Sequence, residues 1–165
     1  MQKTALILIQ QQITQRVEEC MERACKGLQR QFAMPTIKFN QRGKIAGSAR
    51  LHLNELRFNP VLLMDNVEHF LSDVVPHEIC HLISFQLFGR VRPHGKEWQA
   101  LMVELYGIKP HPYHAMDVSK VAGKKFSYRC SCGPVELSIR RHNKVVRKQQ
   151  QYRCLKCGTQ LVAAY

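Results

Sequence analysis

The segment His77-Glu78-Ile79-Cys80-His81 constrains this chain more than any other part of its sequence. Histidines four residues apart lie one turn above each other on one face of an α-helix, so both imidazoles can bind the same metal ion. Glu78 is offset from His77 by about 100° around such a helix, which directs its carboxylate toward a water molecule instead of the metal. The pattern therefore predicts a helix that carries a catalytic zinc ion, with Glu78 as the general base.

A catalytic zinc ion usually has three protein ligands, which leaves one coordination position for water. His94 is the predicted third ligand, because a turn at residues 89–93 can bring the start of the next helix back over the first. Glu97 and Glu104 are the alternatives, since some zinc peptidases use a glutamate from a following helix. A structural interpretation also competes, in which the histidines of the motif are hydrogen-bonded core residues of a buried helix.

The first third of the chain combines a helical pattern with strand-like patterns. Apolar residues within 4–31 recur at spacings of three and four, which is the period of an amphipathic helix. Pro35 blocks continuation of this helix. Short β-prone stretches follow at residues 36–39, 45–53 and 55–58, and they predict a small meander of two or three strands.

Residues 61–88 are rich in apolar side chains and are predicted to be helical. Ser72 and Asp73 are favourable N-cap residues, and Pro76 is tolerated only close to a helix start. A short helix is therefore expected first, followed by a longer one that begins near residue 72 or 73. A further helix is predicted over residues 95–106, where a glycine follows the last apolar position.

Seven cysteines are present, and four of them form two tight pairs near the C-terminus. An odd number with this spacing indicates metal binding instead of disulfides in a reducing compartment. Each pair is followed by glycine, as in the knuckles of a zinc ribbon, although the first pair has one intervening residue where two are usual. Because a segment of roughly 40 residues cannot build a large core, a zinc ion would supply its folding energy. The predicted ligands are Cys130, Cys132, Cys154 and Cys157, with His142 in reserve.

The residues between the two knuckles carry a strand-like pattern. Alternating Val135, Leu137 and Ile139, and then Val145 and Val146, predict two or three short strands. The remaining cysteines are expected to be small buried apolar side chains; they are Cys20, Cys25 and Cys80.

The net charge of +13 is concentrated in the last part of the chain. Residues 122–165 hold ten Lys and Arg against one acidic residue, Glu136. Such a density attracts a polyanion, with nucleic acid as the first candidate and an anionic membrane surface as the second. The alternative is a solvated charged face that only improves solubility.

Five of these basic residues lie together in a region predicted to form a strand and a turn. The aromatic residues Phe126, Tyr128 and Tyr152 flank this region. Phosphate contacts from the basic side chains and stacking of bases on the aromatic ones would suit DNA binding without sequence-specific readout. A purely structural role for the ribbon is the alternative. The predicted nucleic-acid contacts are Arg140, Arg141, Lys144, Arg147 and Lys148.

Neither a membrane span nor a signal peptide is apparent in the sequence. The longest N-terminal apolar run, residues 5–9, ends at three glutamines and is far shorter than the roughly 20 residues of a spanning helix. A signal peptide would need a longer apolar stretch and a small-residue cleavage site. We therefore expect a cytoplasmic protein that acts as a monomer.

Several runs of the sequence resemble the bacterial SprT proteins, whose metazoan relative is the DNA-dependent protease Spartan. The runs are Val-Val-Pro-His-Glu-Ile-Cys-His at 74–81, Phe-Gly-Arg-Val at 88–91 and Pro-His-Gly-Lys-Glu-Trp at 93–98. The resemblance extends from residue 59 to the C-terminal cysteines. It implies that His94 is the third zinc ligand, that the short spacing of Cys130 and Cys132 is shared by the family, and that the protein acts on proteins crosslinked to DNA. Cys80 departs mildly from the family, in which a small residue such as alanine is common.

The sequence thus predicts an α+β fold with a zincin-like metallopeptidase domain over residues 1–115, a linker over 116–125 and a β zinc ribbon over 126–165. One catalytic and one structural zinc ion are expected, with DNA and a protein substrate as partners. The main alternative is a zinc-containing nucleic-acid-binding regulator without proteolytic activity, and a zinc-stapled protein-interaction module is the third. Oxyanion-stabilising candidates, chosen by proximity alone, are His111, Tyr113 and His114.

Overall fold

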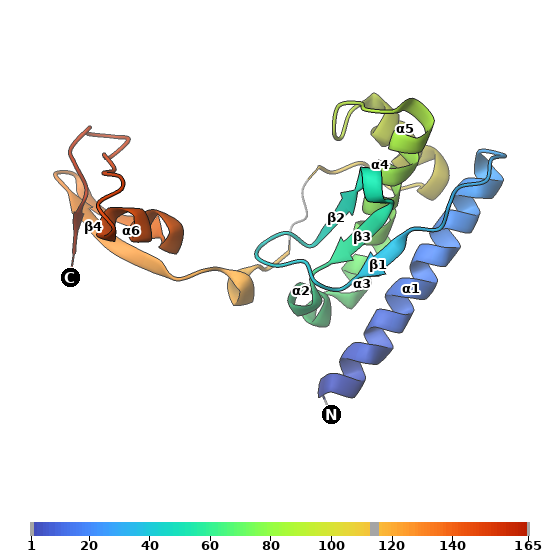
Figure 1. Cartoon of the computed structure of the whole chain (residues 1–165), viewed down its shortest axis with the longest axis horizontal. Coiled ribbons are helices and arrows are strands. Elements are labelled where there is room, and N and C mark those ends of the chain that lie inside the picture. Colours follow the sequence, from blue (N-terminus) through green and yellow to red (C-terminus); the bar gives the residue numbers. More distant parts are fainter. Residues whose placement is uncertain (1, 113–115, 165) are drawn as a thin grey trace. The chain divides into compact units, whose positions relative to one another are not determined.

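The structure of the chain is a computed structural model that describes residues 2–112 and 116–164 (Figure 1). The chain divides into two compact units, Met1–Val121 and Ala122–Tyr165. This division falls inside the segment 116–125 that the sequence predicts to be a linker. The short 3-10 helix η3 (Ser119–Val121) belongs to the first unit, because Lys120 forms an ion pair with Asp65 at 2.8 Å.

The first unit combines helices with a three-stranded sheet (Figure 1). No helix in the described ranges is both long enough and apolar enough to cross a membrane. The elements in chain order are α1 (Gln2–Gly27), β1 (Thr36–Lys38), β2 (Gly47–Arg50), the 3-10 helix η1 (Leu51–Leu53), β3 (Glu55–Phe58), α2 (Pro60–Asp65), α3 (Val67–His69), the π-helix η2 (Phe70–Val74), α4 (Val75–Phe88) and α5 (Lys96–Tyr106).

The sheet of the first unit has the strand order β1-β3-β2. β1 pairs with β3 in parallel, whereas β2 pairs with β3 in an antiparallel hairpin. The predicted strands are therefore present, but the prediction of a meander is wrong, because the last strand occupies the centre. Residues 51–53 were expected to extend the second strand and instead form η1, after which Asn54, with φ of 46°, reverses the chain. β2 consequently lies at an edge of the sheet.

The helix that carries His77 and His81 begins earlier than the sequence predicts. α3, η2 and α4 follow one another without interruption, so Ser72 and Asp73 lie inside a helical segment and do not cap one. In a regular α-helix Pro76 has no N–H to donate to the Ser72 carbonyl, and its ring crowds that carbonyl. The π turn resolves this conflict, because the Val75 N–H reaches back five residues to the Phe70 carbonyl and widens the helix ahead of Pro76.

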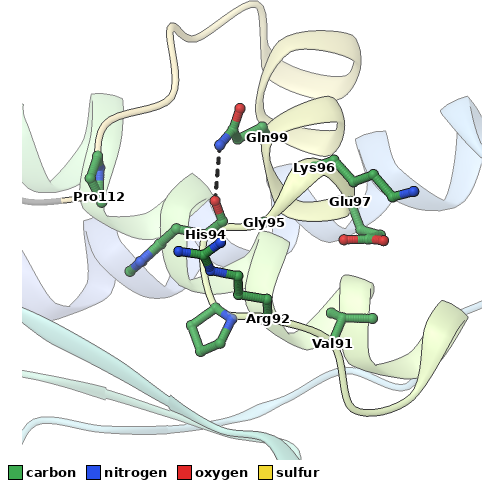
Figure 2. A pocket seen from close by; sticks show the side chains of 9 residues that line it. Val91, Arg92, His94, Gly95, Lys96, Glu97, Gln99 and Pro112 are labelled. Carbon is green, nitrogen blue, oxygen red and sulfur yellow. Dashed lines mark hydrogen bonds between the residues drawn. The ribbon is translucent and has the colours of Figure 1, made fainter.

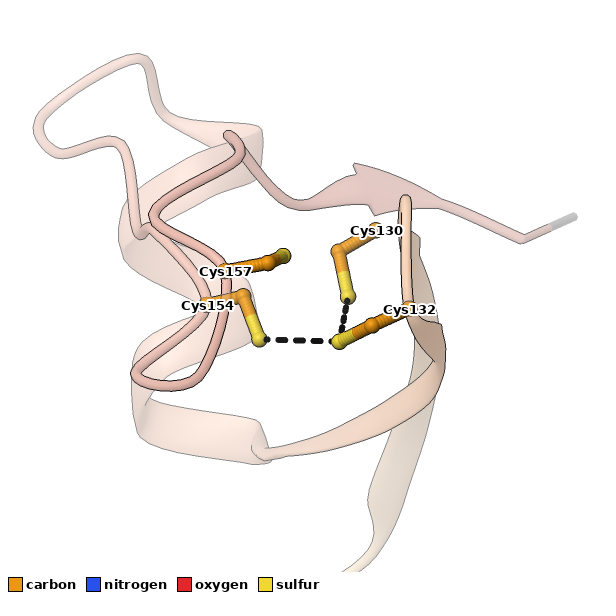
Figure 3. A group of neighbouring side chains, drawn as sticks. All are labelled: Cys130, Cys132, Cys154 and Cys157. Atoms are coloured by element: carbon orange, nitrogen blue, oxygen red, sulfur yellow. Dashed lines mark hydrogen bonds between the residues drawn. The ribbon is translucent and has the colours of Figure 1, made fainter.

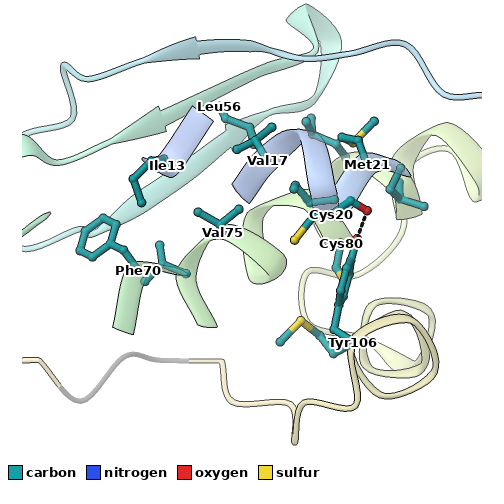
Figure 4. Packing of buried hydrophobic residues seen from close by; sticks show 14 of the residues in the cluster. Ile13, Val17, Cys20, Met21, Leu56, Phe70, Val75, Cys80 and Tyr106 are labelled. Atoms are coloured by element: carbon teal, nitrogen blue, oxygen red, sulfur yellow. Dashed lines mark hydrogen bonds between the residues drawn. The ribbon is translucent and has the colours of Figure 1, made fainter. Parts of the chain in front are cut away.

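The core of the first unit forms around α4 (Figure 4). Side chains from α1 and from β3 point toward those of η2 and α4, and the Tyr106 hydroxyl of α5 donates a hydrogen bond to the Cys20 carbonyl of α1 at 2.9 Å. Cys20 and Cys80 are buried, as predicted, and Cys25 is half-buried. Fully buried members of this core include Ile13, Val17, Met21, Leu56, Phe70 and Val75.

The second unit consists of β4 (Lys125–Cys130), β5 (Gly133–Ser138), α6 (Ile139–Val146) and β6 (Val162–Ala163). β4 lies in the centre of its sheet and is antiparallel to both β5 and β6. The buried core is small and consists of Tyr128, Leu137, Cys154 and Leu161.

The prediction of strands at Val145 and Val146 is wrong, because both residues belong to α6. The β-branched pair favoured a strand locally. The wider pattern is helical, however, since Ile139, His142 and Val145 recur at a spacing of three and face the less polar side of α6. The basic residues of this region therefore lie on a helix instead of on a strand and turn.

Asn59 is a buried polar residue that fixes both the start of α2 and the loop before β2. Its side chain is nearly inaccessible, at 1% exposure. Oδ1 accepts hydrogen bonds from the N–H groups of Val61 and Leu62. Nδ2 donates to the carbonyls of Gly43 at 2.7 Å and Ile45 at 3.2 Å. One amide therefore provides a helix cap and holds the loop that leads into the edge strand.

We predict that Asn59→Ala lowers the free energy of unfolding by about 2 to 4 kcal/mol, because it removes the cap and leaves two loop carbonyls without their donor. Urea denaturation of the zinc-loaded protein measures this change. Asn66→Ala is the matched control at the next helix boundary, since the Asn66 side chain donates one bond to the Leu62 carbonyl and makes no N-cap hydrogen bond. Equal losses in the two variants would contradict the role given to Asn59.

Candidate metal centre

Three histidine side chains converge beside α4. His77 and His81 lie one turn apart on that helix, and His94 lies directly before Gly95, the N-cap of α5. The Nε2 atoms of His77 and His94 are 3.0 Å apart, those of His81 and His94 are 3.1 Å apart, and those of His77 and His81 are 3.3 Å apart. The structure thus brings together the three residues that the sequence predicts as ligands, and they form a group able to hold one metal ion.

The geometry of the three ring nitrogens fits a zinc ion. With Zn–N bonds of about 2.0 to 2.1 Å, the ligand atoms of a tetrahedral site lie roughly 3.3 Å apart, close to the separations found here. Burial, with a smaller effect from neighbouring His94, lowers the pKa of His81 to about 4. The imidazole of His81 is therefore neutral at pH 7, which leaves a lone pair for a metal.

Trp98 supports all three histidines, and the sequence pattern alone did not assign it this role. The indole is 1% exposed and its Nε1 donates a hydrogen bond to the His77 carbonyl at 3.1 Å. Its ring lies 4.7 Å from the rings of His77 and His94 and stacks at 5.5 Å on that of His81. The signal in the sequence was the spacing, since Trp98 follows His94 by four residues and lies in the first turn of α5.

The two glutamates that were alternatives to His94 lie elsewhere. A pocket of about 760 Å³ opens beside His94, and Figure 2 shows the Glu97 side chain on the opposite side of the Gly95 backbone from the His94 ring. Glu104 lines a different pocket together with Glu22 of α1. Among the described residues, neither glutamate belongs to the group that can hold an ion with the three histidines.

Glu78 directly follows His77 in α4 but does not belong to the histidine cluster. Its side chain is 5% exposed, and the Ala49 N–H of β2 donates a hydrogen bond to the carboxylate. Burial raises the pKa of Glu78 to about 8, and the hydrogen bond from Ala49 opposes this rise. A bound cation would also favour the carboxylate. This is the arrangement expected of a general base that acts beside a metal site.

The structure does not support a role for the three residues that were proposed to stabilise an oxyanion. His111 is exposed near the end of the first described segment. Tyr113 and His114 lie outside the described residues.

Four cysteine side chains of the second unit point toward a common centre (Figure 3). The Sγ atoms of Cys130 and Cys132 are 3.3 Å apart, and those of Cys132 and Cys154 are 3.6 Å apart. All four Sγ atoms, including that of Cys157, lie within 4.8 Å of one another. With Zn–S bonds of about 2.3 Å, tetrahedral sulfur ligands lie roughly 3.8 Å apart, so the cluster fits a zinc ion closely.

The electrostatics of the cysteine cluster also favour a cation. Hydrogen bonding with Thr159, through its side chain first and its backbone second, lowers the pKa of Cys157 to about 6. Hydrogen bonds with Cys130, and then with Cys154 and Cys157, raise the pKa of Cys132 to about 12. Thiols this close do not readily ionise together, because the negative charges of the thiolates repel one another. A divalent cation bound between them neutralises this repulsion.

His142, the reserve ligand, is used elsewhere in the second unit. Its ring stacks on Phe126 at 3.6 Å, and its Nδ1 lies 3.1 Å from the Tyr128 hydroxyl. This arrangement also corrects the expectation that Phe126 and Tyr128 could stack on bases. Tyr128 is fully buried and Phe126 is covered by the imidazole, which leaves Tyr152, half-buried under the Arg141 guanidinium at 5.5 Å.

The five predicted nucleic-acid contacts are grouped by α6. With 100° between successive residues, Arg140, Arg141 and Lys144 share one arc of the helix, and Arg147, the C-cap, extends it to about 120°. In a strand Arg140 and Arg141 would have pointed to opposite faces. Lys148 follows the C-cap with φ of 55°. Of the five basic side chains, Lys144 is half-exposed and the other four are exposed. The correction from strand to helix therefore concentrates the positive charge on one face.

Comparison with family models matches both units of the chain. The model of the SprT-like family matches residues 17–115, and the model of the SprT-like zinc ribbon domain matches residues 124–164. The first match contains His77, His81 and His94, and the second contains the four cysteines of the cluster. The second unit is accordingly a zinc-binding ribbon.

Curated proteins named Protein SprT are similar to this chain over most of its length. The protein from Shewanella oneidensis is 51% identical over 156 residues, which cover 94% of this chain and 100% of that protein. The one from Vibrio parahaemolyticus is 50% identical over 139 residues, covering 84% of each chain. The one from Klebsiella pneumoniae strain MGH 78578 is 45% identical over 157 residues, covering 95% of each. No solved structure matches this chain.

We predict that the wild-type chain binds two zinc ions and that the two sites can be emptied separately. Metal analysis should find about one ion in His77→Ala, which loses one of three imidazoles, and about one ion in Cys154→Ser, which loses one of four thiolates. His52→Ala is the control, because His52 is exposed and lies outside both clusters. A single ion in the wild type would mean that one cluster is misinterpreted.

The fluorescence of Trp98 can assign the two ions, since it is the only tryptophan of the chain and contacts the three histidines. A zinc titration should change this fluorescence in the wild type and in Cys154→Ser. The change should be absent in His77→Ala, whose remaining ion is held by cysteines.

Proposed function

Because the chain belongs to the SprT-like family, we propose that it is a zinc-dependent metallopeptidase that acts on DNA-bound or DNA-crosslinked proteins. The observation that carries this proposal is Glu78 itself, a buried glutamate that directly follows His77 in α4 and lies outside the group of three converging imidazoles. A site that bound zinc for structure alone would have no use for such a carboxylate. For stability alone, an apolar residue at position 78 would be better than a carboxylate, because burying a carboxylate is costly.

The proposed reaction is the hydrolysis of a peptide bond. A zinc ion held by His77, His81 and His94 would supply a Lewis acid that polarises the peptide carbonyl and lowers the pKa of water to about 7. The Glu78 carboxylate accepts a proton from the water that attacks the carbonyl carbon. Glu78 then returns this proton to the amine nitrogen as the C–N bond breaks, which restores the carboxylate. Trp98 and the Ala49 N–H keep the reacting groups in position.

The basic face of α6 supports the proposed action near DNA. Four Lys or Arg side chains share an arc of about 120° on α6 and its C-cap, and a fifth follows directly. Such a face suits contact with successive phosphates, which gives affinity without sequence preference. By holding the peptidase next to DNA-bound protein, the ribbon would raise the effective concentration of substrate.

We predict that Glu78→Gln binds both zinc ions and loses proteolytic activity by about 10² to 10⁴-fold, because the amide cannot accept the proton of the attacking water. The assay uses the zinc-loaded protein, a purified DNA-binding protein as substrate, and reactions with and without single-stranded DNA. Loss of zinc from Glu78→Gln would make Glu78 a ligand and contradict its role as a base.

Glu97→Gln is the matched control for this experiment. Glu97 is also a glutamate near His94, but it lies outside the group that can hold the ion. It should retain activity within a few fold of the wild type. Equal losses in both variants would show that the assay reports the charge of the region and not general-base catalysis.

We further predict that the variant Arg140→Ala/Lys144→Ala/Arg147→Ala binds single-stranded DNA more weakly. Each phosphate contact contributes about 0.7 to the slope of log affinity against log salt, so the slope should fall by about 2 when three contacts are lost. Fluorescence anisotropy at several salt concentrations measures both quantities. Both zinc ions should remain bound.

The control for this variant removes the same charge from the end of α1 and the turn after it, as Arg23→Ala/Lys26→Ala/Arg30→Ala, since these residues are also exposed. Its affinity and salt slope should match those of the wild type. If the α6 variant also keeps both, α6 does not bind DNA and the ribbon is a structural element. If the wild-type protein binds DNA but cleaves no substrate, the result favours the alternative function, a nucleic-acid-binding regulator without proteolytic activity.

A further inference from the structure

We propose that Gly47 of β2 is a positioning residue for Glu78, because the side chain that this position lacks leaves the space in which the Glu78 carboxylate is seated. This inference rests on the proposed role of Glu78 as the general base. Its structural part, the seat itself, can be measured without any activity.

The close approach of Glu78 explains why position 47 is a glycine. A methyl group added at Gly47 would lie 2.9 Å from Glu78 Cγ and 3.1 Å from Glu78 Oε1. It would also lie 3.0 Å from Val74 Cγ1. Contacts this short force the neighbours to move. Gly47 is absent from the glycines with positive φ, so any residue could adopt its backbone conformation and space is the constraint.

The position of β2 at the edge of the sheet leaves the Ala49 N–H available for the second contact with Glu78. The Asn59 N–H donates to the Ala46 carbonyl at 2.8 Å, and hydrogen-bonded pairs alternate along an antiparallel ladder. Ala49, paired with Leu56, therefore directs its N–H away from β3 and toward the free edge of the sheet. There it donates to the Glu78 carboxylate.

Gly47 and Ala49 are two residues apart and so belong to the same face of the strand. This is the face on which their partners Phe58 and Leu56 are buried. Glu78 is consequently fixed at three points: its backbone in α4, its aliphatic carbons against Gly47, and its carboxylate on the Ala49 N–H. Displacing it by about 1 Å should cost roughly 10²-fold in rate, because proton transfer depends on that position.

Gly47→Ala tests the proposal, with Ser48→Ala as the matched control in the same strand. The Ser48 side chain points to the other face, where its hydroxyl donates to Gln41. We expect Gly47→Ala to keep both zinc ions and its KM while kcat falls by roughly 10²-fold. Ser48→Ala should behave as the wild type. Unchanged kcat in Gly47→Ala would overturn the proposal.

A double-mutant cycle shows whether Gly47 acts through Glu78. If it does, Gly47→Ala/Glu78→Gln should be no less active than Glu78→Gln alone, because the displaced base is already missing. Additive losses would overturn the proposal and give Gly47 a role independent of Glu78.

The hydrogen exchange of the Ala49 amide provides a readout besides activity. Glu78→Ala removes the acceptor and should accelerate exchange at Ala49, and Gly47→Ala should accelerate it similarly. Ser48→Ala should not. This measurement remains valid if the wild-type protein proves to have no proteolytic activity, so failure of the seat and failure of the proposed function are distinguishable. Unaltered exchange in a folded Gly47→Ala variant would overturn the proposal.

Gly47→Ala also crowds Val74, which is unrelated to Glu78, and a second variant separates the two effects. Gly47→Ala/Val74→Ala removes the Val74 Cγ1 contact and so relieves this crowding, while kcat and the Ala49 amide protection should stay low. Recovery of both in this double variant would move the cause to Val74 and overturn the proposal.

Discussion

The burial of polar residues on α4 is the constraint on which the first unit depends. His77 and Glu78 are 4% and 5% exposed, in a helix whose neighbouring positions belong to the apolar core. Burying such groups is costly unless each has a partner. The partners come from different elements: His94, directly before α5, places its Nε2 3.0 Å from that of His77, and the edge strand β2 provides an N–H for Glu78. The other helices and the sheet thus provide the partners for the buried polar residues in one turn of α4.

The two units solve the problem of stability in different ways. The first unit has an extensive apolar core in which α1, the sheet and α5 surround α4, so its fold does not depend on a metal at the three histidines. The second unit buries little more than Tyr128, Leu137 and Leu161 around its cysteines. Its fold therefore depends on the metal, since so small a core cannot offset the entropy of ordering the chain. The charged side chains of α6 do not belong to this core.

The sequence predicted those features of the fold and site that follow from local spacing. The helical face of His77 and His81, the turn that returns His94, and the paired cysteines are all set by periodicity or by turn chemistry. Three features were not predicted. The π turn before Pro76 depends on a helix that packing extends backward. α6 was missed because the β preference of Val145 and Val146 was weighted above the helical spacing of the wider segment. The support from Trp98 requires a crossing of α4 and α5 that no local pattern specifies.

A crystal structure of the zinc-loaded chain, with anomalous diffraction measured on both sides of the zinc absorption edge, tests the central claim most directly. An ion should appear about 2.0 to 2.1 Å from the Nε2 atoms of His77, His81 and His94, with the Glu78 carboxylate outside its coordination shell and still bonded to the Ala49 N–H. The absence of an ion at the three histidines in a crystal whose ribbon holds one, or direct coordination by Glu78, would contradict the assignment of a catalytic zinc with Glu78 as its base.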